Sequence, residues 1–200
     1  MIYLGQVPIS QAYAGDKEKF KAFKNDIMFN VHCCLPCIVQ SFDREKMTID
    51  AQPAIRERVI GEDGQIEYIN YPLLINVPVL QYGAKNYCIS FPIEKGDECL
   101  VFFSDLSIDN WWLNGDVQNP VEQRRHDLSD GFAIFGIMNQ EKMKENKFNE
   151  EPPLDGLSIF DTKSGAGITL VDGDVMLTVV NGTSTKTYSM TDTFNLVWNG

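Results

Sequence analysis

The sequence predicts an all-β protein with a short N-terminal helix, and three observations lead to this fold class. Short runs rich in Val, Ile and Phe alternate with tight polar turns from Leu35 to Phe103. One stretch ahead of them has apolar residues at helical spacing. No alternation of strands with long helices is visible, as a parallel sheet would require. A 44% hydrophobic share and a 22% charged share indicate a folded chain.

Residues 1–30 are expected to form an arm followed by an amphipathic helix that begins near Asp16, a plausible N-cap. The apolar residues of this helix recur at steps of three and four: Phe20, Phe23, Ile27 and Met28. Such a stripe normally packs on a neighbouring element. We expect it to cover the next domain, and a docking helix for a partner protein is the alternative.

Residues 31–150 are expected to form the β domain. Its predicted strands are 38–42, 48–56, 66–71, 73–80, 89–92 and 99–103. The segments Gly61–Gly64 and Lys95–Asp97 are turn signals between strands. Pro78 within a strand indicates an edge position or a bulge. Short strands with tight turns are typical of a small barrel or sandwich.

A polar stretch over residues 139–153 ends in Pro152-Pro153 and separates two domains. We place the second domain at residues 151–200. This segment has short strands rich in Thr and Gly, and it is too small to bury enough apolar surface alone. It either extends the preceding sheet or winds around identical copies into an intertwined β-prism. The candidates for the shared core of such a needle are Ile168, Leu170, Val175, Leu177 and Val179.

Several segments between His32 and Gln140 carry a resemblance to a known family. They are His32–Asp43, Asp50–Arg56, Val77–Val79, Phe91–Ser104, Asp109–Gly115 and Arg125–Ala133. This part of the chain resembles the N-terminal barrel domain of the gp138-type membrane-piercing phage spikes. The resemblance covers a little over half of the chain.

The resemblance implies an oligonucleotide/oligosaccharide-binding (OB) type barrel that serves as a trimerisation and hub-docking platform. It also implies a C-terminal trimeric β-helix needle that tail contraction drives through the outer envelope of a Gram-negative cell. The expected protein is therefore a homotrimeric virion protein at the tip of the tail baseplate. It would be assembled in the host cytoplasm, bind a baseplate hub protein, and contact the host outer membrane mechanically.

One feature departs from this family. Some spikes of this kind hold an iron ion at the apex through a His-x-His pair, whereas the two histidines here, His32 and His126, lie far from the C-terminus. We expect no tip metal. The tip is then closed by apolar residues, for which the candidates are Phe194, Leu196 and Trp198, or another protein caps it, or this chain is shorter than usual.

The five cysteines are odd in number and irregular in spacing, which argues against a disulfide framework. Cys34 and Cys37 form a C-x-x-C next to His32 and Cys33, but a structural zinc site usually needs a second pair. We expect reduced, partly buried thiols, with a zinc or redox site as the alternative.

Four further motifs have both a chemical and a structural interpretation. His126-Asp127 is read as a turn histidine before a helix cap in preference to a metal site. Trp111-Trp112 is read as core or subunit interface, with sugar stacking as the alternative. Asp172–Asp174 and Gly165–Gly167 are read as turns, not as a calcium or a phosphate loop.

No catalytic residue, cofactor-binding residue or metal-ligand set is predicted, so we expect no enzyme and no cofactor. The formal net charge of -11 argues against nucleic acid as a partner. Two alternative functions remain open at this point. One is a tail-associated cell-wall hydrolase, and the other is a monomeric OB-type binding module.

Overall fold

The computed structural model describes residues 15–61, 63–145 and 156–191. The chain divides into two compact units, Met1–Ile137 and Met138–Gly200. The division after Ile137 lies ahead of the predicted boundary between residues 150 and 151. Within the described ranges, none of the helices is both long enough and apolar enough to cross a membrane.

The first unit begins with the helix α2 (Asp16–Asn30), as the spacing of its apolar residues predicts. Its N-cap is Gly15 and not Asp16, which is the first helical residue. The expected packing of the stripe on the next domain is wrong for this chain, because Phe20 is 70% exposed and Phe23 is 62% exposed. The helix therefore carries an uncovered apolar stripe.

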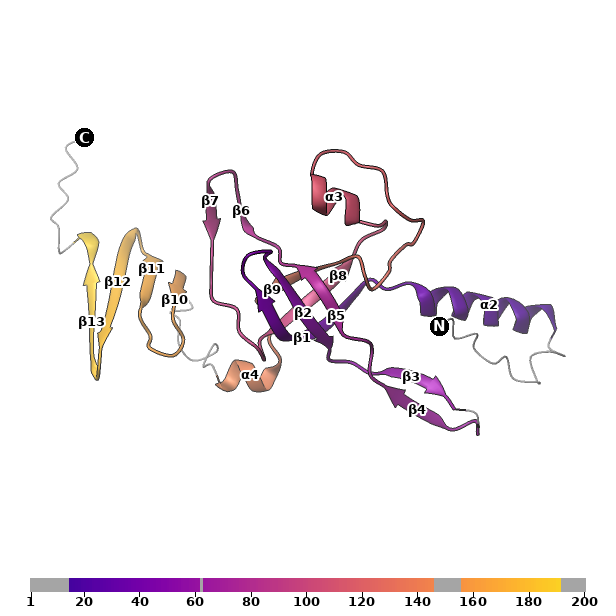
Figure 1. Cartoon of the computed structure of the whole chain (residues 1–200). Coiled ribbons are helices and arrows are strands. Elements are labelled where there is room, and N and C mark those ends of the chain that lie inside the picture. The colour runs from indigo at the N-terminus through magenta and orange to yellow at the C-terminus, as the bar shows by residue number, and fades with distance from the viewer. Residues whose placement is uncertain (1–14, 62, 146–155, 192–200) are drawn as a thin grey trace. The chain divides into compact units, whose positions relative to one another are not determined.

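The centre of the first unit is a five-stranded antiparallel sheet in the order β5-β2-β1-β8-β9 (Figure 1). Its strands are β1 (Cys34–Asp43), β2 (Thr48–Pro53), β5 (Leu74–Pro78), β8 (Glu98–Phe103) and β9 (Gly131–Phe135). A parallel bridge between Val79 and Ala133 brings the two outer strands together, and the Leu80 amide donates to the Ala133 carbonyl at 2.8 Å. The sheet therefore curls on itself and fits an OB-like barrel.

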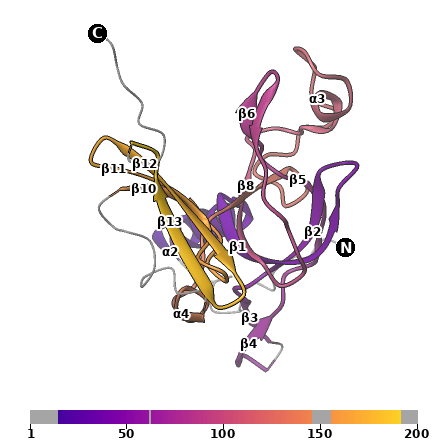
Figure 2. The same ribbon diagram turned by 90° about the vertical axis from the view of Figure 1, so that its left-hand side faces the viewer.

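Two irregularities supply the curl that Figure 2 shows in β1, β2 and β5. The register of β1 against β2 shifts between Val39 and Ser41. The register of β2 against β5 shifts between Ile49 and Ala51, opposite a stretch that contains Asn76 at φ 53°. Bulges bend the strand that holds the extra residue. Pro78 lies in an outer strand of the sheet, as predicted, and the irregularity lies slightly earlier in that strand.

The core of this barrel comes from alternate residues of its strands, whose side chains fill the concave side. These buried residues are Cys37, Val39, Ile49, Ala51, Leu74, Val77, Val79, Cys99, Val101, Phe103 and Ala133. Gly131 is required by this packing, because a Cβ there would lie 2.7 Å from Val101 Cγ1.

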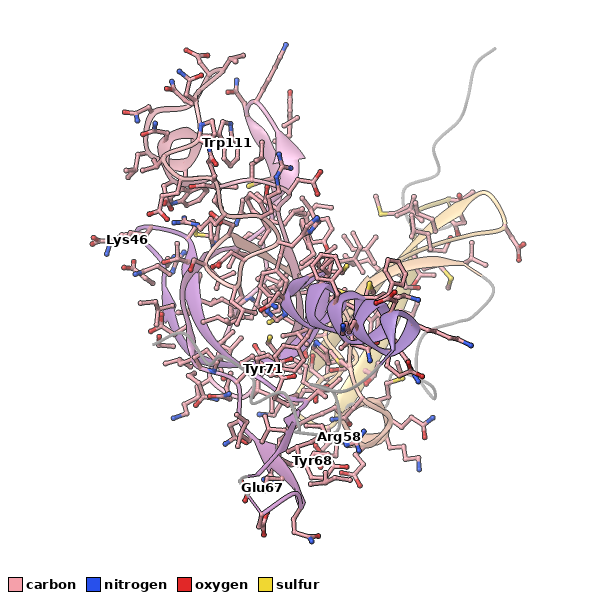
Figure 3. The ribbon with its side chains drawn as sticks, turned by 90° about the vertical axis from the view of Figure 1, so that its right-hand side faces the viewer. Lys46, Arg58, Glu67, Tyr68, Tyr71 and Trp111 are labelled. Atoms are coloured by element: carbon pink, nitrogen blue, oxygen red, sulfur yellow. The ribbon has the colours of Figure 1, made fainter. Side chains whose placement is uncertain are left out.

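Two hairpins and a helix interrupt the barrel strands (Figure 1). The hairpins are β3 (Glu57–Ile60) with β4 (Ile66–Ile69), and β6 (Tyr82–Ala84) with β7 (Tyr87–Ile89). The helix α3 (Asp109–Asn114) lies in the segment between β8 and β9. Figure 3 shows Glu67 and Tyr68 on the β3–β4 hairpin, at the opposite end of the unit from Trp111.

The second unit contains the short helix α4 (Gln140–Glu145) and an antiparallel sheet in the order β10-β11-β12-β13. The strands are β10 (Leu157–Phe160), β11 (Gly167–Val171), β12 (Asp174–Asn181) and β13 (Ser184–Ser189). Each strand pairs with the next one along the chain, as in a meander.

Candidate functional site

One face of the sheet of the second unit is rich in apolar side chains, with Asn181, Ser184 and Lys186 as its polar members. Successive residues of a strand point to opposite faces, so every second residue of β10, β11, β12 and β13 shares this face. Its apolar members are Leu157, Ile159, Ile168, Leu170, Val175, Leu177, Val179 and Tyr188. We call this set of residues the apolar face.

The register places these side chains in rows across the strands. One row runs through Leu157, Leu170 and Val175, which are opposite one another in neighbouring strands. A second row contains Ile168 and Leu177, continued by Ile159 on one side and Tyr188 on the other. The apolar side chains therefore form a continuous surface and are not scattered along the sheet.

No described residue of the second unit covers the apolar face. Its side chains are between 38% exposed, at Val175, and 67% exposed, at Leu157 and Ile159. A sheet normally buries one face against another layer. Contiguous exposed apolar surface of this kind marks an interaction site in a native protein.

All five residues expected in the needle core lie on this face, which follows from their spacing of two within each strand. Sequence reasoning missed Leu157, Ile159 and Tyr188. The alternation of Leu157-Ser158-Ile159 was visible in the sequence. For Tyr188 the polar strand around it offered no such signal, and only its register opposite Leu177 identifies it.

The opposite face of the same sheet is held by hydroxyl groups. Ser158 and Thr169 share a hydrogen bond of 2.9 Å, and Thr178 and Thr187 share one of 3.2 Å. Such cross-strand pairs stabilise neighbouring strands and remain compatible with water. The opposite face therefore combines these hydroxyl pairs with the half-buried apolar side chains of Phe160, Val171, Met176 and Val180.

The segment Asp172–Asp174 is a hairpin turn, as predicted. Asp172 has φ 49° and Gly173 has φ 79°, the pattern of a two-residue turn that matches the strand twist. The Asp174 carboxylate accepts hydrogen bonds from the hydroxyls of Ser189 and Thr191, at 2.8 Å from Thr191 Oγ1. Those bonds, led by the one from Ser189, lower the pKa of Asp174 to about 2. This carboxylate therefore ties the end of β13 to the β11–β12 turn.

The segment around Gly165 is also a turn, in agreement with the sequence. The Gly165 amide donates to the Asp161 carbonyl at 2.7 Å, and the Asp161 amide donates to the Ala166 carbonyl at 2.8 Å. Gly167 is already the first residue of β11. The expected tip residues Phe194, Leu196 and Trp198 lie outside the described residues.

The C-x-x-C motif is divided between two environments. Cys37 is buried and faces the barrel core, opposite Cys99 in the neighbouring strand, whereas Cys34 is exposed. Residues three apart on a strand point to opposite faces, so these two thiols cannot bind one ion together. Burial raises the pKa of Cys37 and of Cys99 to about 12, which keeps both thiols protonated.

His126 and Asp127 lie in a turn, but the expected helix does not follow, since β9 begins at Gly131. His126 has φ 48°, and its Nε2 lies 3.4 Å from Asp105 Oδ1. Asp127 Oδ1 accepts the Ser129 amide at 2.9 Å and so closes the turn. Over the described part of the chain, no group of three or more His, Cys, Asp or Glu side chains is placed to hold a metal ion.

Trp111 and Trp112 are not core residues, because they are 45% and 41% exposed on α3. The Trp111 ring contacts Phe132 edge-on at 6.0 Å, which attaches the helix to β9. The tryptophan pair is therefore not part of the core. A subunit interface and a sugar-stacking surface are the two interpretations that agree with its exposure.

Comparison with known proteins identifies the first unit. Residues 35–136 match the family model described as the phage protein Gp138 N-terminal domain. These residues span all five strands of the curled sheet apart from Cys34, the first residue of β1. No curated protein matches the chain.

Proposed function

The chain belongs to the family of phage proteins that carry the Gp138 N-terminal domain, and we propose that it is the trimeric central spike of a contractile tail, which pierces the host outer envelope. The family membership supports a role in the virion. The apolar face of the second unit carries the spike proposal, because three such faces turned inward would form the dry core of a needle.

The size of the apolar face supports an assembly of several copies. Burying the remaining half of a large apolar side chain is worth about 1 kcal/mol, so the eight side chains together contribute on the order of 8 kcal/mol per chain. That is comparable with the whole folding free energy of a typical domain. Assembly would therefore decide whether the second unit is stable.

The mechanical demands of a needle fit the same surface. Strands that pair between or around copies leave fewer open sheet edges, and a packed apolar axis resists bending. The opposite face, which carries the hydroxyl pairs beside half-buried apolar side chains, would then lie on the outside of the needle. In this proposal the barrel binds the baseplate hub, and the needle is the part that enters the host membrane.

Light scattering after size-exclusion chromatography tests the trimer. We expect the wild type to have three times the mass of the 22.6 kDa chain. Leu177→Lys places a charge in the middle of the apolar face and should yield single chains. Thr185→Lys adds the same charge to the exposed opposite face and should remain trimeric. A single-chain mass for the wild type would refute the spike.

The location in the virion needs a separate measurement. Antibodies raised against the purified chain should label the distal tip of the tail in electron micrographs of intact phage. Label confined to the capsid, or an equal signal on particles from a phage that lacks the gene, would contradict the placement at the tip.

A further inference from the structure

The helix α2 lies outside the residues that match the family, which begin at residue 35. Its apolar stripe of Phe20, Phe23 and Ile27 is 70%, 62% and 46% exposed. Burying the two phenylalanine rings would contribute several times more free energy than the intrinsic stability of an isolated helix of this length. The stripe therefore needs a surface to cover it.

The connection to the barrel leaves the helix little freedom to fold back. Only residues 31–33 separate α2 from β1. The His32 amide donates to the His126 carbonyl at 3.3 Å, and the Cys33 carbonyl accepts the Phe103 amide at 2.9 Å. The His32 ring also packs edge-on against Tyr71 and Phe103, each at 6.0 Å. A short linker fixed at these points favours an occupant that belongs to another molecule.

The stripe is bordered by positive charge. The helix contains four lysines and three acidic residues, Asp16, Glu18 and Asp26, and Lys19 lies 4.0 Å from Asp16, in a chain whose net charge is -11. On a helix of 3.6 residues per turn, Lys17 and Lys24 flank the stripe on one side and Lys19 flanks it on the other. The surface that covers the stripe should therefore be apolar with an acidic rim.

A bundle of three α2 helices does not meet this requirement. With Phe20 and Phe23 at the a and d positions of a heptad, Lys19 is at g and Lys24 at the following e position. A parallel bundle would place Lys19 of each helix beside Lys24 of its neighbour. This like-charge contact argues against self-association of the helices.

The segment between β8 and β9 has the matching properties. It exposes Leu113 by 78% and Val117 fully, beside the half-exposed pair Trp111 and Trp112. From residue 105 to residue 122 the sequence contains four carboxylates and no Lys or Arg. Arg124 pairs with two of these carboxylates, those of Asp109 and Glu122. Arg124 forms no ion pair with the other two, Asp105 and Asp116. Asp105 Oδ1 lies 3.4 Å from His126 Nε2.

We propose that α2 of one copy docks on the α3 segment of a second copy, with Phe20, Phe23 and Ile27 against Trp111, Trp112 and Leu113. Lysines beside the stripe face the carboxylates of that segment. This contact rests on the proposed trimer for the arrangement of the copies. It would link the barrels of the assembly in addition to the needle.

Photocrosslinking in the full-length protein tests this contact. Phe23→p-benzoylphenylalanine keeps an aromatic ring in the stripe and captures its neighbour on irradiation. In an equal mixture of ¹⁴N and ¹⁵N chains that were unfolded and refolded together, we expect mixed-isotope crosslinks to the peptide that contains Trp111–Leu113. The matched control is Asn25→p-benzoylphenylalanine, on the opposite side of the helix, which should give at least fivefold fewer.

Each other outcome has a definite meaning. A trimeric mass with crosslinks only within one chain, to another segment, or to none overturns the docking and leaves the spike standing. A single-chain mass overturns both proposals. Charge exchange supplies a second readout that a general loss of folding would not mimic. Lys17→Glu with Lys24→Glu should reduce the crosslink severalfold, and Asp105→Lys with Asp116→Lys in the same chain should restore it.

Discussion

Arg124 donates two hydrogen bonds to the buried carboxylate of Asp130, from Nε to Oδ2 at 2.6 Å and from Nη2 to Oδ1 at 3.0 Å. Asp130 is only 1% exposed and also accepts the Ile108 amide at 2.9 Å. A second bond from Nη2 reaches Asp109 at 2.6 Å. This guanidinium therefore connects Asp109 at the start of α3 with Asp130 just before β9. The hydrogen bonds that Arg124 donates, first to Asp130 and then to Asp109, raise its pKa.

Arg124→Ala should destabilise the barrel by about 3–5 kcal/mol, because it leaves the Asp130 carboxylate buried without its cation. The free energy of unfolding in urea measures this change. Arg125→Ala removes an exposed neighbour and should cost less than about 0.5 kcal/mol. Equal losses in the two variants would show that the ion pair is not a clamp.

Gly131→Ala should destabilise the barrel by about 1–3 kcal/mol, because the added methyl group would overlap the Val101 side chain. The double variant Val101→Ala with Gly131→Ala makes room for that methyl group. It should lose less than the sum of the two single variants, as measured in a thermodynamic cycle. Strict additivity would mean that the two side chains do not meet.

Two of the five thiols should resist alkylation in the native protein. Cys37 and Cys99 are buried with pKa values of about 12, whereas Cys33, Cys34 and Cys88 are exposed. The thiolate is the reactive form, so iodoacetamide at pH 8 should modify only the three exposed cysteines. Mass spectrometry after a brief reaction would show this, and denaturant should release the other two. Rapid native labelling of Cys37 would contradict the barrel packing.

The attachment of β13 should persist under mild acid. The pKa of Asp174 is lowered to about 2, so its contribution to stability is complete above the unfolded value near 4 and disappears as the pH falls through 2. The Thr191 amide donates to Asp174 Oδ1 at 3.1 Å. Hydrogen exchange should show this amide protected at pH 5 and less protected in Asp174→Asn, which keeps one neutral acceptor oxygen in place of the carboxylate.

Asp172→Asn is the matched control for that experiment. It lies two residues away at φ 49°, a conformation that asparagine adopts readily. Protection of the Thr191 amide should be unchanged in this variant. If both variants opened the strand equally, the turn and not the Asp174 carboxylate would be responsible.

The α2 helix shows what sequence alone can determine and where it stops. Apolar residues at steps of three and four predicted its range correctly, since a helix brings such residues to one face. The partner of that face could not be predicted, because spacing along a chain does not say which surface lies across from it. The prediction that the next domain covers it failed at Phe20 and Phe23.

The barrel divides in the same way. Alternation and turn signals predicted most of its strands, because both are local properties of the chain. They did not predict β3, the β6–β7 hairpin or α3. Residues of β9 were singled out only as part of the segments that resemble the family. The pairing of Val79 with Ala133 and of Arg124 with Asp130 depends on segments that meet only after folding.

By itself, the sequence determined the β class, the helix, the family of residues 35–136 and the two-residue spacing of the needle candidates. Only the tertiary structure decided that Ile168, Leu177 and Tyr188 share one uncovered face, because strand register sets which residues are neighbours. Spacing within a strand selects the side of the sheet, whereas the hydrogen-bonded register between strands turns separate residues into a surface.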